Sequence, residues 1–223
     1  MKNKLKAIKG ILFDFDYTLA DSSRGVVKCI NYALERLKFA KVPAEEVRKT
    51  IGLTLEHTFL MLLGKQHIDE TERFKSYFIE KADEVMADNT TMFVETSNVI
   101  KLLHNKGLRL GIVSTKFRYR IENILCRENL LEFFDVIVGG EDISHLKPDP
   151  LGLMHAIKKL NLHTSEVIYI GDSAVDAETA QRAGIHFVAV LSGITPQDAF
   201  NQSQVIIFLK NLSELPLILG IKL

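Results

Sequence analysis

Two pairs of aspartates are the residues of this sequence with the clearest chemical potential. Asp14 and Asp16 directly follow a short apolar run, and Asp172 and Asp176 follow a second run of the same kind. Two carboxylates separated by one residue of extended backbone point the same way. Such a pair must bind a cation or share a proton. A solvated turn is the alternative for each pair taken alone, and Asp172 could instead cap a helix.

A hydroxyl group and a cation could join these carboxylates. Ser114 and Thr115 follow another apolar run, where we expect backbone N–H groups at a helix start to hold a phosphate oxygen. Lys147 precedes a rigid Pro-Asp-Pro turn. In this turn we expect Asp149 to cap a helix and Pro150 to occupy its first position. A solvated surface position is the alternative for Lys147 taken alone.

The apolar runs predict the strands that position these side chains. They cover residues 8–13, 108–113, 136–138, 167–170 and 187–191, each followed by a polar or glycine-containing turn and then a helical pattern. This alternation predicts an α/β domain with a Rossmann-like parallel sheet. Ligands of such sheets bind outside the carboxyl ends of the strands, so the candidate residues are expected to meet there.

The segment between the first two predicted strands has a different pattern. From about residue 22 to about residue 89, apolar residues recur at helical spacing, which predicts an inserted domain of three or four helices. We therefore expect an α/β core domain of residues 1–18 and 92–223 and a helical domain of residues 19–91. Four polar residues of the insert are candidates for selecting a substrate, with packing or solvation as the alternative for each: Arg24, Lys49, His57 and Lys75.

Composition and charge exclude several classes of protein. The 223 residues are 47% hydrophobic and 25% charged, which is typical of a globular chain that can bury a core. The 28 basic residues balance the 28 acidic ones, so the charge excess of a nucleic-acid-binding protein is missing. No apolar run approaches the length of a membrane span. The only cysteines, Cys29 and Cys126, form no disulfide or zinc motif, and we expect a cytoplasmic protein.

Four short motifs, taken in their order along the chain, resemble those of the haloacid dehalogenase superfamily. They read Asp14-x-Asp16-x-Thr18-Leu19, Ser114, Lys147-Pro148 and Gly171-Asp172-Ser173-x-x-Asp176. The helical insert resembles the C1 cap of that superfamily. The Asp21-Ser22 pair after Leu19 is similar to that of the phosphoglycolate-phosphatase-like members. That group also includes pyrophosphatases, sugar phosphatases and phosphomutases.

The resemblance implies roles for the four aspartates. Asp14 is implied to be the nucleophile that forms an aspartyl phosphate, and Asp16 the group that protonates the leaving oxygen and then activates water. A Mg2+ ion is implied, held by the Asp14 carboxylate, the Asp16 backbone carbonyl and Asp172. These are the hard oxygen ligands that this ion prefers. Asp176 is expected to orient these ligands rather than to bind the metal.

The resemblance also implies roles for the residues of the remaining motifs. Ser114 and the Thr115 backbone are implied to hold the phosphoryl oxygens, and Lys147 to offset their negative charge. Tyr17 departs from the family pattern, which usually has glycine there, and Thr115 occupies a position that is often asparagine. Neither departure removes a catalytic group, but Tyr17 places a ring beside the catalytic turn.

The implied function is a Mg2+-dependent phosphatase for a small phosphorylated metabolite, such as phosphoglycolate, a sugar phosphate or pyrophosphate. Asp16 favours this chemistry over carbon–halogen cleavage, because the dehalogenases have no leaving alkoxide to protonate. Two alternatives stay open. They are a phosphomutase of the β-phosphoglucomutase type and a non-catalytic binding module of the same fold. We expect a monomer or a homodimer that binds neither nucleic acid nor membrane.

Overall fold

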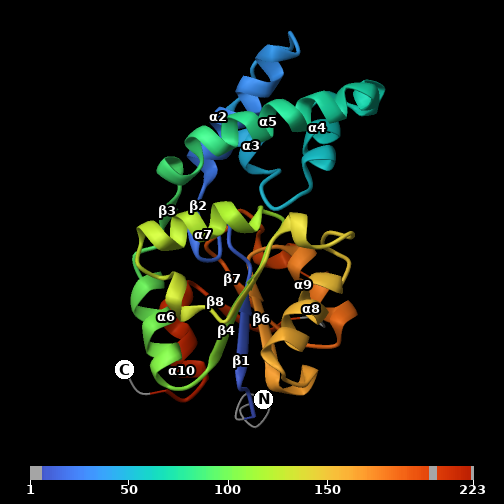
Figure 1. The fold of residues 1–223 in the computed structure, drawn as a ribbon. Helices are drawn as coiled ribbons and strands as arrows, with labels where there is room; N and C mark the ends of the chain where they lie inside the picture. Colours follow the sequence, from blue (N-terminus) through green and yellow to red (C-terminus); the bar gives the residue numbers. More distant parts are fainter. Residues whose placement is uncertain (1–6, 201–204, 222–223) are drawn as a thin grey trace. The chain divides into compact units, whose positions relative to one another are not determined.

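The computed structural model describes residues 7–200 and 205–221 (Figure 1). The first six residues, with which the core domain was expected to begin, lie outside the described residues. The chain divides into two compact units. We call Met1–Ala20 with Met92–Leu223 the core unit, and Asp21–Thr91 the cap unit.

A six-stranded parallel sheet forms the centre of the core unit. Its strands lie in the order β5-β4-β1-β6-β7-β8, which confirms the predicted Rossmann-like α/β fold. Their bounds are β1 (Gly10–Phe13), β4 (Arg109–Val113), β5 (Val136–Val138), β6 (Val167–Gly171), β7 (His186–Val190) and β8 (Val205–Leu209). Five of them coincide with the predicted runs to within two residues. The edge strand β8 was not predicted, since an apolar run of five residues fits a helix equally well.

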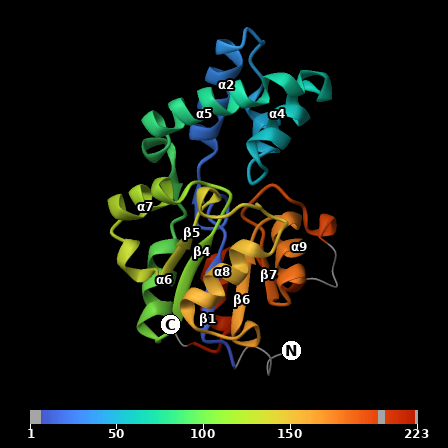
Figure 2. The same cartoon turned by 45° about the vertical axis from the view of Figure 1, so that its right-hand side comes forward.

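Helices cover both faces of this sheet (Figures 1 and 2). On one face lie α8 (Leu151–Leu160) and α9 (Ala174–Ala183), and on the other α6 (Thr96–Asn105) and the short α10 (Leu215–Ile218). The core between the sheet and the first pair contains the fully buried side chains of Leu12, Tyr169 and Ala180. All four residues of β1 are buried, as expected of a central parallel strand.

Local hydrogen bonds fix where two helices begin. The Ser173 hydroxyl accepts the Asp176 N–H at 3.1 Å and caps α9, so Asp172 is not the cap. The Asp149 carboxylate accepts the Leu151 N–H at 2.9 Å, but the N-cap of α8 is Pro150, so the expected cap at Asp149 is wrong by one residue. Pro150 itself precedes the helix, so its expected place at the first helical position is wrong by one residue.

The cap unit contains the predicted helices. They are α2 (Ser23–Arg36), α3 (Ala44–Arg48), α4 (Leu55–Leu63) and α5 (Thr71–Val85). The apolar stripes of these helices form a core of their own, in which the rings of Phe59 and Phe74 stack with centroids 4.7 Å apart. The short strands β2 (Ala20–Asp21) and β3 (Thr91–Met92), through which the chain leaves and re-enters the core unit, pair with one another.

Two of the four candidate selector residues of the cap unit are engaged in local ion pairs. Lys49 lies 2.7 Å from Glu46, and Lys75 lies 2.8 Å from Glu72. Their role in selecting a substrate stays a prediction, as does that of Arg24 and His57.

None of the helices in the described ranges is both long and apolar enough to cross a membrane. Cys29 is buried and Cys126 is exposed, and neither forms a disulfide. The cytoplasmic location stays a prediction.

Candidate active site

The topology of the sheet brings three of the sequence motifs to one point. β1 lies between β4 and β6, and Phe13 stands in register with Ile112 and Ile170. The Asp14 N–H continues this ladder by donating to the Ile170 carbonyl at 2.8 Å. The residues that follow the three strands, Asp14, Ser114 and Asp172, therefore leave the sheet at the same edge.

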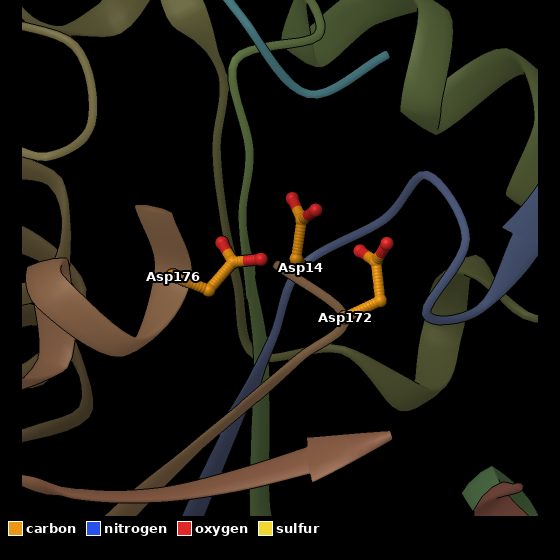
Figure 3. Close-up of side chains that lie close together, drawn as sticks. All are labelled: Asp14, Asp172 and Asp176. Carbon is orange, nitrogen blue, oxygen red and sulfur yellow. The ribbon is translucent and has the colours of Figure 1, made fainter. Parts of the chain in front are cut away.

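Three aspartates converge at this edge (Figure 3). One carboxylate oxygen from each of Asp14, Asp172 and Asp176 lies within 4.8 Å of the other two, and all three residues are buried. Asp14 stands between the other two (Figure 3). The backbone of Gly193 approaches Asp172 so closely that a Cβ there would overlap its carboxylate. Any side chain at Gly193 would therefore force the Asp172 carboxylate to move.

Lys147 is the cation of this cluster. Its Nζ lies 2.9 Å from Oδ1 of Asp14 and 2.6 Å from Oδ1 of Asp176, and only 4% of its side chain is exposed. The alternative of a solvated surface lysine is therefore wrong. Because a buried charge is stable only when it is paired, Lys147 and the aspartates depend on one another.

Tyr169 is a member of the cluster that sequence analysis missed. Its hydroxyl lies 3.0 Å from Oδ1 of Asp176, 2.9 Å from the Val113 carbonyl and 3.2 Å from Nζ of Lys147. The other Asp176 oxygen accepts hydrogen bonds from the Ser173 backbone and hydroxyl. Both Asp176 oxygens are thus engaged with protein groups. A tyrosine in an otherwise aliphatic strand was the only sequence signal for this contact.

The loop after β4, which carries Ser114 and Thr115, is longer than expected before the next helix begins. Helix α7 (Arg118–Arg127) begins at Arg118, so Ser114 and Thr115 lie in the loop before the helix and not at its start. The Ser114 N–H donates to the Val138 carbonyl at 3.1 Å, which places Ser114 beside the end of β5. Its hydroxyl accepts the N–H of Lys116 at 3.4 Å. Ser114 is buried at the same edge of the sheet as the aspartates.

Asp16 is placed apart from the three clustered carboxylates. Its Oδ2 lies 3.2 Å from Nζ of Lys116, which was not singled out by sequence analysis. The only signal for Lys116 was its place two residues after Ser114.

A family model for the haloacid dehalogenase-like hydrolases matches residues 11–190. The chain belongs to this family. Phosphoglycolate phosphatases of Pectobacterium atrosepticum and Escherichia coli are 30% and 26% identical to it over 96% and 98% of this chain, and 94% and 95% of theirs. A solved structure described as a haloacid dehalogenase-like hydrolase of Bacteroides fragilis is 43% identical, with a TM-score of 0.89 over 93% of this chain and 99% of that one. These findings identify a hydrolase of the phosphatase type.

Burial sets the proton affinities in this haloacid dehalogenase-like hydrolase. Loss of solvent raises the pKa of Asp14 from 3.8 to about 6, although the Lys147 ammonium opposes the rise. Burial and the charges of Asp176 and Asp14 raise the pKa of Asp172 well above its usual value. Burial lowers the pKa of Lys147, but the Asp14 and Asp176 carboxylates outweigh it and hold that pKa above its usual value. The lysine therefore stays charged while the carboxylates resist ionisation.

The residues present fit a hard divalent cation. The donors are carboxylate oxygens without histidine or thiol ligands, as Mg2+ prefers. Three buried aspartates surround a single lysine, Lys147, so the cluster holds more acidic than basic groups. A divalent cation beside them would remove this imbalance.

The buried Asp14 carboxylate predicts a pH-dependent stability difference between wild type and Asp14→Asn. In the metal-free protein the folded state keeps the Asp14 proton up to a pH of about 6, whereas the unfolded chain loses it near 3.8. The folded wild type therefore loses stability relative to the variant as the pH rises through this window. Across the whole window, we expect the difference in unfolding free energy to shift in favour of Asp14→Asn by about 3 kcal/mol.

Urea unfolding in chelator at several pH values between about 5 and 7.5 measures this difference. The gap should widen with pH and level off above the folded-state pKa of Asp14. A gap that does not change with pH would contradict the burial argument.

Tyr17 adopts a backbone conformation that explains the family preference for glycine at this position. Its φ of 59° lies in the left-handed region, which costs a residue with a Cβ about 1–2 kcal/mol. The turn is held by hydrogen bonds from the Tyr17 N–H to the Ala20 carbonyl at 2.7 Å and from the Ser192 hydroxyl to the Tyr17 carbonyl at 2.5 Å. Tyr17 is buried, so its ring is part of the packing beside the turn that carries Asp14 and Asp16.

Proposed function

We propose that the protein is a Mg2+-dependent phosphatase that hydrolyses a small phosphorylated metabolite through an aspartyl-phosphate intermediate. The observation that supports this most strongly is the buried set of Asp14, Lys147, Asp172 and Asp176 at the carboxyl ends of β1 and β6. Phosphoryl transfer requires a nucleophile and positive charge at one point, and this set provides both.

In the first step, a carboxylate oxygen of Asp14 attacks phosphorus, and the bond from phosphorus to the leaving oxygen breaks. Asp16 gives its proton to that oxygen, so an alcohol leaves and the phosphoryl group stays on Asp14. Lys147 offsets the charge of the phosphoryl oxygens, and Ser114 with the Thr115 backbone binds them. The position of Lys147, 2.9 Å from Asp14, suits this role.

In the second step, water attacks phosphorus and the bond from phosphorus to Asp14 breaks. Asp16, now a carboxylate, accepts the proton of that water, which restores both aspartates and releases inorganic phosphate. The same residue serves as acid and then as base, so the cycle closes without another proton donor.

The residues that would hold Mg2+ are Asp14, Asp172 and the backbone carbonyl of Asp16. When bound, this ion supplies positive charge that stabilises the transferring phosphoryl group. Asp176 is proposed to orient Lys147 and not to bind the metal, because both its oxygens accept hydrogen bonds from protein groups. It also fixes the start of α9 through Ser173.

We propose phosphoglycolate or a chemically similar small phosphate monoester as the substrate, since two curated relatives are phosphoglycolate phosphatases that this chain matches over 94% or more of their length. Four polar residues of the cap unit are proposed to select it: Arg24, Lys49, His57 and Lys75. The enzyme is proposed to act as a monomer or a homodimer, without nucleic acid or membrane.

The experiment is phosphate release from a panel that contains phosphoglycolate, pyrophosphate, sugar phosphates and nucleotides, with Mg2+ and with chelator. We expect metal-dependent release from one substrate class. Isomerisation of a sugar phosphate without phosphate release would identify a phosphomutase instead. No turnover on any substrate, together with stable capture of a partner, would favour a binding module.

A further inference from the structure

A second buried lysine faces the active-site turn. Nζ of Lys116 lies 3.2 Å from Oδ2 of Asp16, and the two side chains are only 5% and 10% exposed. Lys147 contacts Asp14 and Asp176. Each aspartate of the turn therefore has its own lysine: Lys147 contacts Asp14, and Lys116 contacts Asp16. An ion pair buried to this extent is not a solvated surface contact of small effect.

The loop that carries Lys116 is held in place by the loop after β5. The Gly140 N–H donates to the Lys116 carbonyl at 3.1 Å, and a Cβ on Gly140 would come within 2.5 Å of the Thr115 carbonyl oxygen. The Glu141 carboxylate accepts the Arg118 N–H at 2.8 Å and fixes the start of α7. The backbone of Lys116 is thus anchored on both sides.

The Lys116 side chain extends from this anchored backbone along the turn. Its Nζ lies 5.9 Å from the centroid of the Phe15 ring, within the range of a cation–π contact. Because the Lys116 backbone is anchored, its ammonium group has a fixed position beside Asp16. It can therefore set the orientation of the Asp16 carboxylate.

We propose that Lys116 is a positioning residue that orients the Asp16 carboxylate toward the leaving oxygen of the substrate. This inference rests on the proposed function, in which Asp16 gives its proton to that oxygen. The ammonium group donates to Oδ2 and so restricts rotation of the carboxylate. Proton transfer depends steeply on such geometry, and a displacement of an ångström is enough to slow it.

The test compares kcat/KM for wild type and Lys116→Met on ethyl phosphate, phosphoglycolate and p-nitrophenyl phosphate. The first two release alkoxides that need a proton, whereas p-nitrophenolate leaves without one. We expect Lys116→Met to lower kcat/KM by about tenfold to hundredfold for the two alkyl phosphates. For p-nitrophenyl phosphate we expect a change of less than about threefold.

Two further variants serve as controls. Lys116→Arg keeps a cation at this position. It should restore most of the ratio of kcat/KM on the alkyl phosphates to kcat/KM on p-nitrophenyl phosphate. Lys9→Met removes a lysine–carboxylate pair, 2.6 Å from Glu166, that lies before the amino end of β1, and should leave the ratio unchanged. A structural defect would lower activity on all three substrates alike, and this result would overturn the inference.

The remaining outcomes are equally decisive. Loss confined to phosphoglycolate would overturn the inference and show that Lys116 binds the substrate carboxylate. If the wild type is active and Lys116→Met has the same kcat/KM on all three substrates, the inference is overturned and the proposed function stays intact. A wild type that releases no phosphate from any of the three substrates would contradict the proposed function, and the inference with it.

Discussion

Asp14→Asn is expected to release no measurable phosphate from any substrate that the wild-type enzyme cleaves. The amide lacks the negative oxygen that attacks phosphorus, so the loss is expected to be about 10⁴-fold or more. The variant should still fold, because it removes a buried carboxylate that resists ionisation. Intact mass after an acid quench should show one phosphoryl group on the wild type during turnover and none on the variant.

Asp135→Asn is the matched control for this substitution. Asp135 accepts the Leu110 N–H at 2.9 Å and pairs with Arg109 at 2.7 Å, near the amino end of β4. Asparagine keeps the acceptor there, so activity should be close to that of the wild type. Substantial turnover by Asp14→Asn, or a phosphoryl group trapped on that variant, would rule out Asp14 as the nucleophile.

Lys147→Met is expected to reduce both activity and stability. The lysine is the cation beside the nucleophile, and its loss should slow phosphate release by about 10²–10³-fold. It also leaves Asp14 and Asp176 buried without their ion-pair partner. Breaking a buried pair from one side costs about 3–5 kcal/mol, measured as the free energy of unfolding of the metal-free protein near neutral pH.

The stability loss of Lys147→Met should shrink as the pH falls, because the unpaired carboxylates become protonated and no longer need a cation. Lys158→Met, on the exposed side of α8, is the control and should change neither property. A Lys147→Met variant as stable and as active as the wild type would show that the aspartates do not depend on this lysine.

The sequence by itself determined the architecture and most of the motif residues. Buried parallel strands appear as short apolar runs and amphipathic helices as periodic stripes, and both patterns are local properties of the chain. The polar residues after those runs, Asp14, Ser114 and Asp172, were predicted to meet because parallel strands end at one edge. The division into a core and a helical insert followed from the change of period after the first strand.

The tertiary structure decided which of the nearby polar groups contact one another. Whether Asp172 or Ser173 caps α9, and whether α7 starts at Ser114 or Arg118, depended on hydrogen bonds that several local sequences could satisfy. The contacts of Tyr169 with Lys147 and of Lys116 with Asp16 join residues far apart in sequence. Periodicity cannot specify such contacts, because they depend on the order of the strands and on the packing of the loops between them.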